Sequence, residues 1–177
     1  MTQIRVLDDT TINKIAAGEV VERPASVVKE LVENSIDAGA TKIEVEIMAG
    51  GTSLMRVTDN GCGMSLEDAK LAIERHATSK IQEVGDLYSL RTLGFRGEAL
   101  ASVAAVTRTE MITKARGSKL GTRIVIHGGE ILTKEPVGCP DGTSLIISDL
   151  FYNTPARAKF LKSEAAETSL IIDTVSR

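Results

Sequence analysis

Glu30 and Asn34 lie four residues apart in a stretch, residues 25–38, whose apolar residues recur with helical spacing. At about 100° per residue, the two side chains project about 40° from each other at the margin of the apolar face. A carboxylate and an amide oxygen at a half-dry cleft edge can act on one ligand, whereas Glu33 points toward the polar side and is expected to be a solvated acid. Polar pairs at this spacing are also common on amphipathic helices, so a plain helix surface remains an alternative.

A second group of chemical interest, Asp59-Asn60-Gly61-Cys62-Gly63, directly follows a predicted strand. An ionised aspartate only accepts hydrogen bonds, so Asp59 can take one from an exocyclic amino group such as that of adenine. Gly61 and Gly63 permit positive φ angles and let a flat ligand approach the backbone closely. An ordinary Asp-Asn-Gly turn accounts for the same residues.

A third group ends an irregular stretch and opens a predicted helix. Its backbone N–H groups, its glycines and its arginine suit phosphate oxygens. The residues are Gly94, Phe95, Arg96, Gly97, Glu98, Ala99 and Leu100. Upstream, Thr78 and Lys80 lie in a run of cations and hydroxyls that could add phosphate contacts, although such a lysine is more often a solvated charge. The irregular stretch, residues 85–97, is about 13 residues long, which is typical of a functional lid.

Thr143 follows Asp141-Gly142 at the start of a predicted strand. Its hydroxyl could reach a cleft, but a turn followed by a β-branched strand residue explains the same pattern equally well. The residues alone leave this choice open.

The elements that must position these groups predict an α+β fold. A first helix, capped within residues 8–11, should close at Gly18, and further helices are expected at 25–38, from Ser65, at 98–106, from Pro155 and from Glu164. Strands are predicted at 42–47, 54–58, 108–114, 122–127, 130–134 and 144–149. Because most strands hairpin with their neighbours, we expect a mixed, mostly antiparallel sheet with helices covering one face. Regular strand–helix alternation, which a Rossmann fold needs, is absent.

The charge balance limits the classes of partner. With 21 basic and 24 acidic residues, the net charge of −3 argues against wholesale wrapping by nucleic acid. Residues 91–123 nevertheless hold seven basic side chains against Glu98 and Glu110, a local charge of +5. This stretch supports an alternative function as a non-enzymatic module that binds DNA or protein, although a solvated strand face explains it too. Cys62 and Cys139 form no disulfide framework, and no apolar run reaches the length of a membrane span, so we expect an intracellular protein.

The motifs in this order resemble the GHKL ATPases, which include gyrase, heat-shock chaperones and histidine kinases. The resemblance rests on Glu30 with Asn34, Asp59 with Gly61 and Gly63, residues 94–100, and Gly142-Thr143. Longer stretches resemble one branch of them, the MutL mismatch-repair proteins. These stretches are residues 15–24, 29–39, 75–81 and 151–157, and the match runs from about Ile4 to Leu161.

This resemblance implies a Bergerat fold that binds ATP and Mg²⁺ and hydrolyses ATP slowly. Glu30 would be the general base for the attacking water, and Asn34 would ligate Mg²⁺. Asp59 would accept from the adenine amino group, supported by Thr143 and a bridging water. Residues 94–100 would be the ATP lid, and the nucleotide-binding set would also include Gly61, Gly63, Thr78 and Lys80.

The resemblance also implies a place in DNA mismatch repair, as a switch that couples mismatch recognition to a nuclease. Expected partners are a MutS-type recognition protein, a downstream nuclease or helicase, weakly bound DNA without sequence specificity, and a second copy in an ATP-dependent homodimer, with no membrane. Residues 1–177 would be an ATP-binding fragment, followed in the full protein by a transducer subdomain that supplies a lysine and by a C-terminal dimerisation domain. The expected location is the cytoplasm, at the nucleoid of a bacterium, or the nucleus of a eukaryote.

Overall fold

The computed structural model describes residues 4–74 and 99–177. Its six strands form one sheet in the order β1-β2-β6-β3-β4-β5, which confirms the α+β class. The strands are β1 (Ile43–Met48), β2 (Leu54–Asp59), β3 (Arg108–Lys114), β4 (Gly121–His127), β5 (Glu130–Val137) and β6 (Gly142–Ser148). Every pairing among these strands is antiparallel, so this sheet is more uniform than the expected mixed one.

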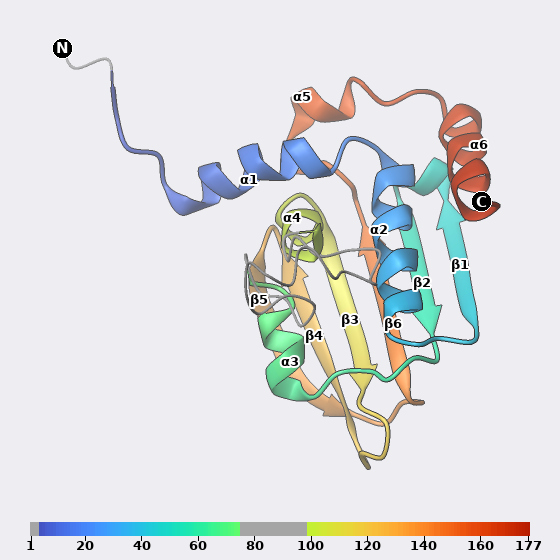
Figure 1. Ribbon diagram of the computed structural model, residues 1–177. Helices are drawn as coiled ribbons and strands as arrows, with labels where there is room; N and C mark the ends of the chain where they lie inside the picture. The colour runs from blue at the N-terminus through green and yellow to red at the C-terminus, as the bar shows by residue number, and fades with distance from the viewer. Residues whose placement is uncertain (1–3, 75–98) are drawn as a thin grey trace, which may run out of the picture.

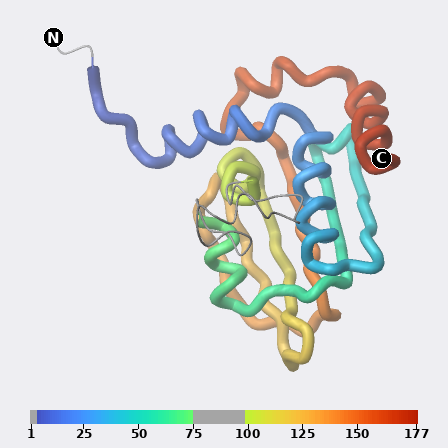
Figure 2. Tube along the Cα trace, in the orientation of Figure 1, coloured from blue at the N-terminus to red at the C-terminus, as the bar shows by residue number. Residues whose placement is uncertain are grey.

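The helices gather on one face of the sheet, as predicted (Figure 1). They are α1 (Asp9–Val20), α2 (Pro24–Asp37), α3 (Leu66–Leu71), α4 (Ala99–Ala105), α5 (Pro155–Ala158) and α6 (Glu164–Val175), with a short 3-10 helix, η1, at Ala49–Gly51. Helix α2 packs on β2 and contacts α4 and α6, while α1 packs on α4. The segment before α1 leads away from the sheet (Figure 2).

The face of the sheet beneath the helices changes from apolar to polar along the strands. One row of register partners across β2, β6, β3 and β4 consists of Val57, Leu145, Met111 and Ile124, all of which are buried. Two residues along each strand, on the same face, the row consists of Asp59, Thr143, Thr113 and Thr122. We call this second set the polar row. It lies at the end of β2 that adjoins the C-terminal end of α2, the lower edge in Figure 1.

Helix α2 begins and ends for local reasons that the sequence contains. Pro24 occupies the first turn, where its missing N–H costs no hydrogen bond. At the other end, Gly39 has a φ of 73°, and its N–H donates to Ile36 O while that of Ala40 donates to Ser35 O. This is a Schellman motif, which satisfies the last carbonyl groups of the helix. Ile36, which the apolar spacing placed on the packed face, is 49% exposed, because Val28, Leu31 and Ser35 form the centre of that face.

Helix α1 continues to Val20, past its predicted end at Gly18. A Cβ atom at Gly18 would overlap the guanidinium of Arg157, so this glycine permits a close contact and does not end the helix. The predicted cap is present, since the Asp8 carboxylate accepts from the backbone N–H of Thr11 at 2.9 Å. Strand β5 also extends further than predicted, to Val137 through Pro136, which is tolerated because β5 is an edge strand.

Candidate functional site

The carboxylate of Asp59 lies at the centre of the site, at the end of β2. Its Oδ2 accepts from the hydroxyl of Ser35 on α2 at 2.7 Å. Its Oδ1 accepts from the backbone N–H of Gly61 at 2.9 Å and from that of Thr143 at 3.3 Å. A carboxylate has about four acceptor positions, so three are filled and one remains for a ligand. The half-buried group is therefore held in one orientation by three separate segments of the chain.

Thr143 is in turn held by Thr113, its register partner on β3. The two hydroxyl oxygens are 2.8 Å apart, and the fully buried Thr113 also accepts from the backbone N–H of Met64 at 3.0 Å. The sequence reasoning named neither Thr113 nor Ser35. The sequence did contain a signal for Thr113. This threonine is the last inward-facing residue of β3, where the preceding inward position is the apolar Met111.

The loop after Asp59 is both a turn and a close approach of two backbone segments. The side chain of Asn60 accepts from the N–H groups of Thr41 and Lys42 at 2.8 and 2.9 Å, which anchors the turn. Gly63 has a φ of 65°, and a Cβ atom there would overlap the carbonyl group of Lys114. The simple turn interpretation is thus correct for Asn60, while the Asp59 carboxylate also bonds to α2 and β6.

Glu30 and Asn34 are half-buried on α2, one helical turn apart. Asn34 directly precedes Ser35, the residue that bonds to Asp59. Asn34 therefore lies near the Asp59 end of α2, and Glu30 lies one turn closer to the middle of the helix. Glu33 lies 3.9 Å from Lys29 as an ion pair, with its side chain 21% exposed. Glu33 is therefore a paired acid, less exposed than the solvated residue that was expected.

Of the seven residues predicted to hold phosphates at positions 94–100, Ala99 and Leu100 are described, and both are half-buried at the start of α4. Gly94, Phe95, Arg96, Gly97 and Glu98 lie outside the described residues, as do Thr78 and Lys80. Helix α4 contacts both α1 and α2, so its first residues lie on the same side of the sheet as Glu30.

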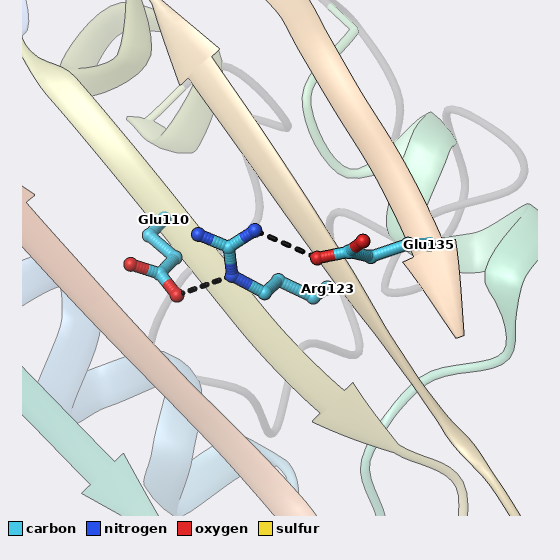
Figure 3. Close-up of polar contacts among 3 residues, drawn as sticks. All are labelled: Glu110, Arg123 and Glu135. Carbon is cyan, nitrogen blue, oxygen red and sulfur yellow. Dashed lines mark hydrogen bonds and ion pairs between the residues drawn. The ribbon is translucent and has the colours of Figure 1, made fainter. Parts of the chain in front are cut away.

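The basic stretch at residues 91–123 does not form a free cationic patch in its described part. Arg108 pairs with Asp149 at 2.7 Å, and Lys114 with Asp141 at 3.0 Å. Arg123 bonds to Glu110 at 2.7 Å and to Glu135 at 2.8 Å (Figure 3). These hydrogen bonds, the one to Glu110 most of all, raise the pKa of the Arg123 guanidinium above its usual value. Acidic partners thus neutralise three of the seven cations, and Arg91 and Arg96 lie outside the described residues.

Within residues 4–74 and 99–177, no three His, Cys, Asp or Glu side chains gather in a way that could hold a metal ion. No helix in those ranges is long and apolar enough to cross a membrane.

Residues 22–129, more than half of the chain, match the family described as histidine kinase-, DNA gyrase B- and HSP90-like ATPases. The chain therefore belongs to this family, whose GHKL type the sequence motifs had indicated. The further resemblance to the MutL branch is confirmed by relatives that are more than half identical to the chain. The DNA mismatch repair protein MutL of Acidobacterium capsulatum is 63% identical over 96% of the chain, and that of Caldanaerobacter subterraneus subsp. tengcongensis is 58% identical over all of it. The chain spans 25% and 30% of the lengths of these two relatives.

Solved structures agree with this assignment of the fold. The Aquifex aeolicus MutL ATPase domain complexed with ADP matches 88% of the chain with a TM-score of 0.72 and 37% identity, and the chain covers 54% of that domain. The N-terminal domain of a DNA repair protein matches 93% of the chain with a TM-score of 0.76 and 30% identity, and the chain covers 47% of it. The Bergerat-type fold expected from the motifs is thus confirmed.

Proposed function

We propose that the chain binds ATP with Mg²⁺ and is the slowly hydrolysing ATPase switch domain of a mismatch-repair protein. The observation that supports this most is the Asp59 carboxylate, which three donors orient and which retains one acceptor position on the helix side of the sheet. A donor such as the adenine amino group fits that position, and a relative of the same fold is named as an ADP complex. Thr143, through a bridging water, would support the same contact.

Mg²⁺ fits the oxygen chemistry of this site as an ion held mainly by phosphate and water. Magnesium commonly keeps several waters and takes one or two protein ligands beside the nucleotide phosphates. Asn34 offers a single amide oxygen from α2, between Ser35 and the middle of the helix. The residues therefore fit an ion that arrives with ATP. When bound, it would neutralise charge on the phosphates.

Glu30, one turn further along α2, would position the attacking water and accept its proton through the side-chain carboxylate. Phosphoryl transfer depends on positioning and charge stabilisation more than on covalent chemistry, so a single well-placed base is sufficient. Gly61 and Gly63 would border the nucleotide base. Residues 94–100, with Thr78 and Lys80, would close over the phosphates as the lid.

In the complete protein we propose that ATP drives homodimerisation and that the dimer signals to a MutS-type protein and to a downstream nuclease or helicase. DNA would bind weakly and without sequence specificity, in the cytoplasm of a bacterium or the nucleus of a eukaryote. The alternative, a DNA- or protein-binding module without enzymatic function, is less favoured because acidic neighbours pair with Arg108, Lys114 and Arg123.

Titration calorimetry of ATP against the protein and its Asp59→Asn variant tests this proposal. The amide would turn an N–H₂ group or a weaker acceptor toward the adenine amino group. A hydrogen bond to a charged group contributes about 1.5–3 kcal/mol, so we expect ATP affinity to fall roughly 10- to 100-fold. Asp173→Asn, at an exposed ion pair on α6, is the control. Equal ATP affinity in both variants would remove Asp59 from the site.

A further inference from the structure

We propose that residues 151–167 form a clamp on three helix ends, and that Asn153, Arg157 and Glu167 are positioning residues for ATP hydrolysis but not for nucleobase binding. This inference rests on the proposed function. The segment runs along the upper edge of the molecule in Figures 1 and 2, whereas the polar row with Asp59 lies at the lower edge.

The first contact of the clamp is on α4. The side-chain N–H₂ of Asn153 donates to the carbonyl oxygen of Ala105, the last residue of α4, at 2.9 Å. The backbone of the same segment is fixed nearby, because Phe151 N–H donates to Val106 O at 2.8 Å. The helix whose first residues, Ala99 and Leu100, belong to the proposed lid is therefore held at its far end by this segment.

The second contact is on α1. The guanidinium of Arg157 donates to the carbonyl oxygen of Val21, the C-cap of α1, at 3.4 Å. It also lies so close to Gly18 that any side chain there would overlap it. Since α1 packs along α4, this contact supports the same side of the site.

The third contact is on α2. Glu167 of α6 is fully buried, and its Oε1 accepts from the N–H of Lys162 at 2.8 Å and lies 3.5 Å from Nη1 of Arg23, the N-cap of α2. Its Oε2 and the Arg23 Nη1 are buried without a hydrogen-bond partner. A buried charge pair with such incomplete bonding stabilises a fold poorly, so a role in placing α2 accounts for it better. Gly51 packs against both Pro24 of α2 and Ile171 of α6, which closes the same joint.

The three contacts act on one end of the site. Arg23 is seven residues from Glu30 but twelve from Ser35, and neither Ser35, Asp59 nor Thr143 hydrogen-bonds to the clamp among the described contacts. A change in the clamp should therefore displace the water-activating residue and the start of the lid, and leave the nucleobase contacts in place. Positional errors of about 1 Å are enough to slow a positioned reaction about 100-fold.

The test compares turnover with ADP affinity in the full-length protein for Asn153→Ala, Glu167→Gln and Gly18→Ala, with Arg56→Gln, at the ion pair with Glu46 between β1 and β2, as the control. Glu167→Gln keeps the acceptor for the Lys162 N–H and removes the charge, so it should fold. We expect each clamp variant to lose at least tenfold in kcat while its dissociation constant for ADP stays within about twofold of the unaltered protein. The control should change neither quantity.

Two results would overturn the clamp. Unchanged kcat in all three variants would show that the contacts do not position the site. A parallel loss of kcat and ADP affinity would show that the contacts only support the fold in general. A protein that binds no ADP before any substitution would instead refute the proposed function. Failure of the clamp and failure of the function are thus separate outcomes.

Discussion

The hydroxyl of Ser35 lies 2.7 Å from Oδ2 of Asp59, so that helix α2 and strand β2 meet at the carboxylate itself. The same hydroxyl lies 3.1 Å from Leu31 O, one turn back along the helix. Because Ser35 has a single proton, its bond to the charged carboxylate is the stronger of the two. The residue next to the proposed magnesium ligand therefore also orients the proposed adenine contact.

Ser35→Ala should weaken ATP binding about 3- to 10-fold, since the carboxylate loses the donor that fixes Oδ2. Ser169→Ala is a matched control, because Ser169 makes the same bond to a carbonyl one turn back, Ala165 O, without touching a carboxylate. Calorimetric affinities for both variants give the comparison. Equal affinities would mean that Ser35 does no more than an ordinary helix serine.

Glu30→Ala should leave ATP affinity nearly intact and lower hydrolysis by roughly 10²- to 10⁴-fold, which is the usual contribution of a general base. Phosphate release by the full-length protein and calorimetric binding measure the two effects. Glu33→Ala, which removes an acid paired with Lys29 on the same helix, should retain turnover. If Glu33→Ala lost turnover and Glu30→Ala kept it, the two assignments would have to be exchanged.

Gly63→Ala should destabilise the fold more than Gly117→Ala. Both glycines have positive φ, 65° and 88°, so both variants carry backbone strain of about 1–2 kcal/mol. Around Gly117 no atom lies within 4 Å of a new Cβ, whereas at Gly63 the Cβ would overlap the Lys114 carbonyl. Overpacking adds about 1–3 kcal/mol, so urea unfolding should separate the two variants by that amount. Equal free energies of unfolding would show that the loop shifts freely.

Acid should loosen the first turn of α1. The backbone N–H of Thr11, and then its hydroxyl, lower the pKa of the Asp8 carboxyl below its usual value. The stabilisation is therefore complete above the unfolded-state pKa of about 3.9 and is lost as the pH falls through the lower value of the folded protein. Hydrogen exchange at the Thr11 amide should rise relative to the intrinsic rate over that range. Asp8→Asn keeps a capping side chain without a titrating group, so its cap should not respond to acid.

The elements predicted most accurately were those with strong local signals. Strand β3 has the predicted bounds, residues 108–114, because its inward and outward residues alternate without interruption. Helix α2 agrees to within one residue at each end, since Pro24 and Gly39 mark its limits. The predicted end of α1 was wrong because the glycine at position 18 leaves room for the guanidinium of Arg157. Arg157 is 139 positions further along the chain, so no local sequence pattern reveals this contact.

The site was predicted in part. The orientation of Asp59 toward α2 agrees with the expected adenine contact, which stays a prediction. Thr113 was missed because its role depends on which strands become neighbours, and the register was not available from the sequence alone. Ser35 was missed because its role depends on how α2 packs on β2. The basic stretch was identified by counting charges, but counting could not reveal that Glu110, Glu135 and Asp149 would pair with its cations.

The polar row joins residues from four strands, with Asp59, Thr143, Thr113 and Thr122 as successive register partners. A slip of one residue in any of these strands would turn its inward side chain to the opposite face of the sheet. Only the correct register of β2 with β6 thus presents Asp59 and Thr143 together. A ligand that binds only the native state adds to its stability. Any molecule that binds the polar row should therefore stabilise the folded protein. We expect it to raise the unfolding temperature of the sheet in a single cooperative transition.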